Sequence, residues 1–279
     1  MKNKVIIITL VFVAGFLGLV YYAIMHSRGI PVKIEKIETP VLAVPFIDTR
    51  IDLSKDISLN TWDTLSGKEI KLMYQVMVLP WPKAVVPSVL VKAFRTQEDI
   101  YFYVSWKDDT EDRTHAMNQF SDACAIMFPL GKEAQPSSIM MGFIGKTNIW
   151  HWKASQDNEY WQGAHPKTDA YADFYYPFEE KELFVVSKQT PQSAVSDLLA
   201  IRVGTVTSKE ANAIQGRGFW KDGAWNVVFK RPLKAENIEE DTGFELGKKR
   251  LCAFAAWNGS KGDRGGRKSI SDWVELDIK

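Results

Sequence analysis

The chain has 279 residues, of which 46% are apolar and 25% charged, and a formal net charge of +1. This composition is typical of a folded globular protein, and a near-neutral charge without a Lys/Arg block argues against nucleic-acid binding. Cys124 and Cys252 form neither Cys-x-x-Cys nor Cys-x-x-Cys-His, which excludes covalent haem attachment, a zinc ribbon and a cysteine-ligated iron–sulfur cluster. Both lie in apolar, strand-like runs. They form either one disulfide or two buried thiols.

The N-terminus carries an uncharged apolar run from Val5 to Met25, preceded by Lys2 and Lys4. The run is long enough to span a bilayer as a helix, and no Ala-x-Ala cleavage pattern follows it. We therefore predict an uncleaved signal anchor over residues 1–28. It would be a single transmembrane helix in the cell membrane, with the remaining chain on the periplasmic side.

The alternative is a secreted protein, cleaved from its leader near Ala23 or Ser27. Residues 29–45 contain three prolines and show no clear hydrophobic period. This composition predicts an extended tether between the anchor and the domain.

Residues 46–279 are expected to form one all-β domain. Strand-like runs flank two turns, at Thr96 to Asp99 and at Asp222–Gly223, and each predicts a hairpin. Further strands are expected over residues 123–128, 148–154, 198–206, 250–257 and 273–278. The segments 179–196 and 232–246 are polar and are predicted to be loops or short helices. Many short strands with turns between them predict a β-sandwich of the immunoglobulin-like or carbohydrate-binding-module-like type.

Few residues in this domain suggest catalysis. The chain has four histidines, none at metal-ligand spacing from another: His26, His115, His151 and His165. His151 is expected to face the side opposite to its neighbours Trp150 and Trp152, as a surface or partner-contacting residue. An acidic loop follows Trp106: Asp108, Asp109, Glu111 and Asp112. Calcium binding there is conceivable, but without an EF-hand pattern a solvated loop is favoured. No nucleophile elbow, phosphate loop or zincin helix is present, so hydrolytic chemistry has no support in these residues.

Two short segments stand out. One contains Met140-Met141-Gly142, followed closely by Asn148-Ile-Trp-His-Trp. The other is a Gly-rich turn before the last strand, Trp257-Asn-Gly-Ser-Lys-Gly-Asp-Arg-Gly-Gly-Arg-Lys-Ser-Ile-Ser-Asp-Trp. Taken alone, the methionines are ordinary core residues and the second segment is an ordinary turn.

Five motifs occur together and in a fixed order: Trp62-Asp, residues 89–106, Phe120 to Pro129, the Met-Gly…Asn-Ile-Trp-His-Trp segment and the Gly-rich ending. In this combination the chain resembles, over residues 50–279, the haem-binding γ subunit of ethylbenzene dehydrogenase. Related subunits belong to dimethylsulfide dehydrogenase, selenate and chlorate reductases and the nitrite oxidoreductase group, all type II molybdoenzymes.

The resemblance implies a β-sandwich that holds one haem b between a methionine and a lysine. The family methionine precedes a glycine, which matches Met141, with Met140 as the fallback. The family lysine lies in the Gly-rich turn and matches Lys268, with Lys261 as the fallback. Arg264 and Arg267 in this turn either pair with the haem propionates, because guanidinium matches carboxylate in a bidentate way, or are ordinary solvent-exposed turn residues.

This ligand pair is chemically sensible. A thioether is a soft iron ligand, and a lysine binds iron only as the neutral amine, which burial favours. With both axial positions filled, the haem would transfer electrons without transforming a substrate.

The resemblance further implies partners: a molybdopterin catalytic subunit, an iron–sulfur subunit, and an exported cytochrome or a quinone-linked redox partner. Two alternatives remain open. One is an exported carbohydrate-binding module without haem, and the other is a scaffolding subunit that has lost the cofactor.

Overall fold

The computed structural model describes residues 15–16, 18–19, 21–22, 39–55, 60–76, 86–114, 119–131, 135–136, 138–139, 142–163, 191–209 and 212–279. The chain divides into two compact units, Met1–Glu38 and Thr39–Lys279. In the first unit the described residues are helical and exposed. None of the helices described is both long and apolar enough to span a membrane. The predicted anchor over residues 1–28 lies mostly outside the described residues.

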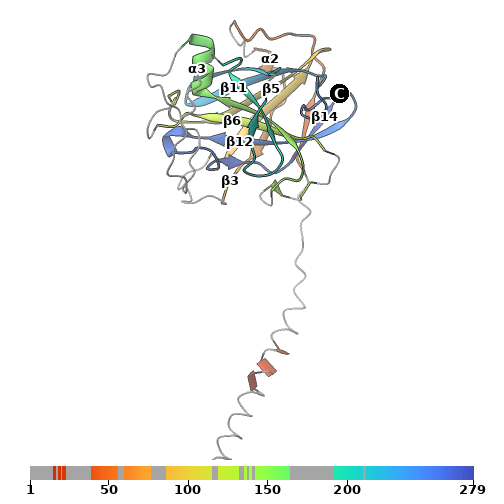
Figure 1. Cartoon of the computed structure of the whole chain (residues 1–279), viewed down its shortest axis with the longest axis vertical. Coiled ribbons are helices and arrows are strands. Elements are labelled where there is room, and N and C mark those ends of the chain that lie inside the picture. Colours follow the sequence, from red (N-terminus) through yellow and green to blue (C-terminus); the bar gives the residue numbers. More distant parts are fainter. Residues whose placement is uncertain are drawn as a thin grey trace, which may run out of the picture. The chain divides into compact units, whose positions relative to one another are not determined.

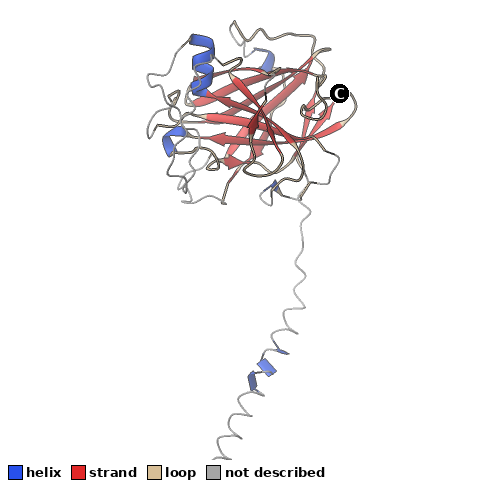
Figure 2. Ribbon diagram, in the orientation of Figure 1, coloured by secondary structure: helices blue, strands red, loops and turns tan. Residues whose placement is uncertain are grey.

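The second unit is built from strands that form two sheets (Figures 1 and 2). Among the described residues, the larger sheet has the order β1-β14-β12-β6-β7-β8-β9, with β13 paired to β12 and β3 paired to β13. The smaller sheet has the order β10-β11-β5-β4-β2. The strands of the larger sheet are β1 (Val41–Val44), β3 (Met73–Tyr74), β6 (Ala123–Pro129), β7 (Thr147–Lys153), β8 (Val195–Ala200), β9 (Thr207–Ser208), β12 (Lys249–Trp257), β13 (Ser269–Ile270) and β14 (Val274–Ile278). Those of the smaller are β2 (Lys68–Lys71), β4 (Ser88–Arg95), β5 (Asp99–Lys107), β10 (Gln215–Lys221) and β11 (Ala224–Pro232).

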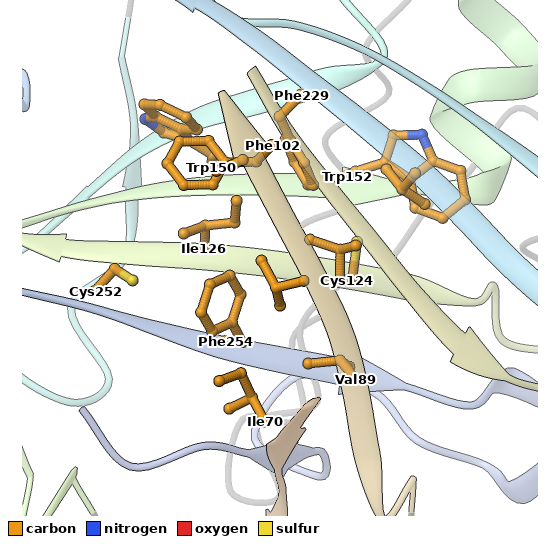
Figure 3. Close-up of a cluster of buried hydrophobic side chains, with 14 of the residues drawn as sticks. Ile70, Val89, Phe102, Cys124, Ile126, Trp150, Trp152, Phe229, Cys252 and Phe254 are labelled. Carbon is orange, nitrogen blue, oxygen red and sulfur yellow. The ribbon is translucent and has the colours of Figure 1, made fainter. Parts of the chain in front are cut away.

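The two sheets pack face to face around one apolar core. Because side chains alternate along a strand, every second residue points inward, as do Cys124 and Ile126 on β6, and Trp150 and Trp152 on β7 (Figure 3). The β-sandwich expected from the strand pattern is therefore confirmed. The outer face of the smaller sheet is also covered, because Trp62 of the short helix α2 (Asn60–Asp63) packs on Phe94 and Tyr103.

Both predicted hairpins are confirmed. Strands β4 and β5 pair around residues 96–98, and β10 and β11 pair around Asp222–Gly223. At the second turn both central residues have positive φ angles, 53° and 74°. Asp-Gly tolerates this conformation, which matches the twist of the flanking strands.

Three expectations need correction. Residues 41–44 belong to strand β1, parallel to β14, and not to a tether, because Leu42 and Val44 are buried in the core. The strand expected over 198–206 runs instead over Val195–Ala200. A helix that was not predicted, α3 (Ala154–Gln162), begins where β7 ends. It has no side-chain N-cap, so the sequence carries no start signal for it.

Both cysteines are free and buried. Cys124 pairs across the ladder with Ala256, whereas Cys252 lies four residues further along β12, opposite Val274 on its other side. Four residues of strand span about 13 Å, which is too far for a disulfide. Figure 3 shows the two thiols at separate places in the core.

Two buried carboxylates hold the start of the Gly-rich turn. Asp122 accepts the Gly259 N–H at 2.8 Å and the Trp225 indole N–H at 2.8 Å. Asp108 accepts the Asn258 side-chain amide at 2.9 Å. Gly259 packs so closely that a Cβ atom there would lie 1.9 Å from the Phe120 carbonyl oxygen. The chain is thereby fixed at Asn258–Gly259.

The acidic loop is thus only partly solvated. Asp109 is exposed, but Asp108 is 2% exposed, because the loop folds back under Trp106 and Trp220. Burial raises the pKa of Asp108 to about 6. Burial and the neighbouring Asp108 carboxylate raise the pKa of Asp122 to about 7.

These raised pKa values predict how stability depends on pH. In the folded protein the two carboxyl groups keep protons that the unfolded chain releases near pH 3.8. The free energy of unfolding therefore falls as pH rises from about 4 to 7. We expect Asp108→Asn to increase the free energy of unfolding at pH 8 and to reduce its fall between pH 5 and pH 8 by about 1 kcal/mol. Urea unfolding at both pH values measures this. The control is Asp109→Asn, which should leave the pH dependence as in the wild type. An unchanged slope in Asp108→Asn would contradict the prediction.

Candidate functional site

The candidate site is built on the C-terminal segment that follows β12. After Trp257, a 3-10 turn (Gly259–Lys261) is capped by the Asn258 side chain, which accepts the Lys261 N–H at 3.0 Å. A second tight turn follows, because the backbones of Arg264 and Arg267 bond to each other at 2.8 and 3.1 Å. The chain then enters β13, which pairs with β12 on one side and β3 on the other. These turns bring Lys268 back over the end of β12.

Lys268 is partly buried, and its Nζ lies 5.1 Å from the centroid of the Trp257 ring. The indole is held in turn by its N–H, which donates to the Gly265 carbonyl at 3.0 Å. Burial lowers the pKa of the Lys268 amine to about 8. In the part of the chain that the structure describes, this amine has no hydrogen bond and no ion pair. It is therefore an amine that readily becomes neutral and has a lone pair to offer.

Lys261, the fallback, is in a different environment. It is exposed at the surface of the 3-10 turn, where water solvates the ammonium. Of the two lysines, the structure brings only Lys268 into partly buried, apolar surroundings.

The methionines Met140 and Met141 lie outside the described residues. Their chain neighbours are described. The Ile139 N–H donates to the Asp272 carboxylate at 2.8 Å, and Gly142, at a φ of 91°, donates its own N–H to the Ile139 carbonyl at 2.8 Å. The loop that carries the two methionines is thus bonded, just before them, to a residue four positions after Lys268.

The two arginines of the turn differ. The Arg264 guanidinium lies 4.4 Å from the Phe120 ring centroid and donates to the Gly262 carbonyl at 3.0 Å. Arg267 lies beside Tyr74. Burial raises the pKa of the Tyr74 hydroxyl, and the Arg267 side chain offsets part of that rise. Its Nε is buried and has no hydrogen-bond partner among the described residues. Arg267 therefore has an N–H group left for an anionic ligand.

The outer face of the larger sheet adds a residue that sequence reasoning did not assign to the site. His151 on β7 packs against Trp257, with ring centroids 4.8 Å apart and the ring planes tilted by 32°. Between them in the sheet lie the small residues Ala123 and Ala125 of β6, which are buried. Alternation along β7 indicated that His151 faces away from the core, but only the ladder β12-β6-β7 shows that it meets Trp257. His26, His115 and His165 lie outside the described residues.

Among the described residues, no three His, Cys, Asp or Glu side chains gather as metal ligands. One shallow hollow of about 360 Å³ lies at the end of the sandwich near the acidic loop, lined by Glu111, Asp112, Arg113, Thr114, Gln119, Phe120, Gly259 and Ser260. Its lining is mostly polar and includes neither Lys268 nor Trp257. The geometry so far singles out Lys268, Trp257, His151 and Arg267.

Comparison with known proteins gives three curated relatives. The chain is 28% identical over 217 residues to the Haloferax mediterranei protein named "Putative respiratory nitrate reductase heme subunit ORF7", covering 77% of this chain and 65% of that protein. It is 22% identical to chlorate reductase subunit gamma of Ideonella dechloratans, covering 69% and 66%. It is 26% identical to dimethylsulfide dehydrogenase subunit gamma of Rhodovulum sulfidophilum, covering 67% and 59%. The matched region thus spans slightly less than two thirds of each relative.

Among solved structures, a family 9 carbohydrate-binding module from Caldicellulosiruptor kristjanssonii, in complex with glucose, is 9% identical, with a TM-score of 0.41 over 86% of this chain and 95% of that one. Such a value supports no conclusion about a ligand. The family of this chain is shown instead by a match of its sequence to a family model. The family model described as "Ethylbenzene dehydrogenase" matches residues 60–269, and this chain belongs to that family.

Proposed function

We propose that this chain is an electron-transfer subunit that holds one haem b without covalent attachment, with Met141 and Lys268 as its axial ligands. One observation carries the proposal: the Lys268 amine is withdrawn from water, its pKa is lowered to about 8, and it has no hydrogen-bond partner among the described residues. Such an amine is suited to donate its lone pair to a metal. A relative named as a heme subunit supports the choice of metal group.

The donor set fits the group. A thioether is a soft ligand that favours ferrous iron, and haem proteins use methionine in this way to raise the potential. The buried Nε of Arg267 is an orphaned donor, and guanidinium pairs with carboxylates such as haem propionates. Arg264, which is engaged with Phe120 and Gly262, is the less favoured of the two.

The residues around Lys268 have separate roles in the proposed haem site. The Trp257 ring lies 5.1 Å from the Lys268 amine, and the Gln75 N–H holds the Lys268 backbone by donating to its carbonyl. Bound haem supplies one-electron exchange. With a protein ligand at each axial position, the chain is not expected to carry out substrate chemistry of its own.

We further propose the setting in which this subunit works. Relatives named as gamma subunits of a reductase and a dehydrogenase support a multi-subunit oxidoreductase, here with a molybdopterin catalytic subunit and an iron–sulfur subunit. Electrons would pass between the clusters and an exported cytochrome or a quinone-linked partner. The N-terminal apolar run supports a domain tethered to the periplasmic side of the cell membrane.

The cofactor itself is tested on the purified full-length protein. Haemin titration should saturate at one haem per chain, and the reduced-minus-oxidised spectrum should show a b-type band. A folded protein that binds no haemin would overturn the proposal. If the same protein were retained by an immobilised polysaccharide, it would be a carbohydrate-binding module, and without such retention a scaffold.

The ligands are tested by substitution. Met141→Ala and Lys268→Ala should each lose or shift the haem absorption spectrum, because each removes an axial ligand, while circular dichroism shows the sandwich still folded. Met140→Ala and Lys261→Ala are the matched controls and should keep the wild-type spectrum. Wild-type spectra in both ligand variants would refute the assignment. Loss of the spectrum in a control instead would move the ligand to that residue.

A further inference from the structure

Gln75 follows β3 and lies directly opposite Lys268. The register of β13 with β3 pairs Ser269 with Tyr74 and Ile270 with Met73. The next pair in this antiparallel register is Lys268 with Gln75, and the Gln75 N–H indeed donates to the Lys268 carbonyl at 2.9 Å. Directly opposed residues place their Cβ atoms about 4.5–5.5 Å apart on the same face. The two side chains are therefore cross-strand neighbours.

The Gln75 side chain has a buried oxygen with nothing to accept. Its Oε1 is buried and has no hydrogen-bond partner in the described part of the chain. A buried carbonyl oxygen without a donor destabilises the fold, so such atoms are rare and call for an explanation. The side chain opposite it is Lys268, whose amine is a donor and has no hydrogen bond among the same residues.

A neutral amine that gives its lone pair to a metal still carries two N–H groups. In a site closed to water these protons need acceptors. An acceptor of this kind orients the ligand and makes it a stronger donor, as outer hydrogen bonds do for other metal ligands. The amide oxygen of a glutamine side chain is such an acceptor.

We propose that Gln75 is the positioning residue of the Lys268 ligand: its Oε1 accepts one N–H of the coordinated amine and aims the lone pair at the iron. This inference rests on the proposed haem function and adds a residue to it. Gln75 does not touch the iron. It acts through Lys268, so its effect should appear in the properties of the haem more than in the stability of the fold.

The test compares three variants of the full-length protein. Gln75→Leu keeps the size of the side chain and removes the acceptor. Gln75→Glu keeps an acceptor. Gln215→Leu is the matched control, because Gln215 also lies opposite a lysine, Lys230, in an antiparallel pair, but is exposed on β10. For each, haemin affinity, the midpoint potential and the electron paramagnetic resonance spectrum of the ferric haem are measured.

We expect Gln75→Leu to weaken haemin binding about tenfold, to shift the ferric resonance signals and to raise the midpoint potential. The rise follows because a weaker donor stabilises ferric iron less. Gln75→Glu should restore the wild-type ligand signals with a potential at or below that of the wild type. Gln215→Leu should match the wild type throughout.

The outcomes separate the two proposals. If the wild type binds haemin with Lys268-dependent signals and Gln75→Leu leaves affinity, potential and signals unchanged, the role of Gln75 is refuted and the haem function stands. If the wild type binds no haemin, both fall. If Gln75→Leu does not fold, Gln75→Glu decides. If the midpoint potential of Gln75→Glu lies at or below the wild-type value and the ligand signals are the same, the positioning role of Gln75 is supported. If the potential lies above the wild-type value, that role is refuted.

Discussion

The site depends on keeping one amine out of water. A lysine side chain favours its charged, solvated form, and burial against an aromatic ring works against that preference. Here the chain accepts this cost at Lys268, where Trp257 lies under the amine and lowers its contact with solvent. An amine held in this way has few uses in a structural role, since it makes no ion pair among the described residues. The proposed role as an iron ligand requires an amine in such surroundings.

Several weak constraints combine to hold that amine in place. Asp108 and Asp122 fix the start of the turn at Asn258–Gly259, and the mutual bonds of Arg264 and Arg267 close it. The two-residue strand β13 then joins the segment to β12 and β3. Each bond contributes about 0.5–3 kcal/mol, with bonds to carboxylates at the upper end. Together they leave the backbone at Lys268 few alternatives, which is what a ligand bond of fixed direction requires.

The core side chains and the side chains of the candidate site lie on opposite faces of the larger sheet. Its inward faces carry the large aromatic and aliphatic side chains of the core, whereas His151, Trp257 and the small alanines of β6 lie on the outward face of the larger sheet. Changes on the outward face therefore need not disturb the core. The Ile139 N–H, just before the two methionines, is bonded to Asp272, which joins the described parts of two segments that are far apart in the sequence.

The sequence by itself determined the fold class, both hairpins, most strands and the identity of the Gly-rich turn, because alternation and turn residues act over a few neighbouring positions. Its resemblance to a family also selected Lys268 over Lys261. It could not reveal α3, which lacks a capping residue, or strand β1, whose partner β14 lies at the other end of the chain. Only the tertiary structure decided that Asp108 is buried, that His151 meets Trp257 and that Gln75 lies opposite Lys268. These facts depend on ladder register between distant strands, and a one-residue shift in register would have changed every one of them.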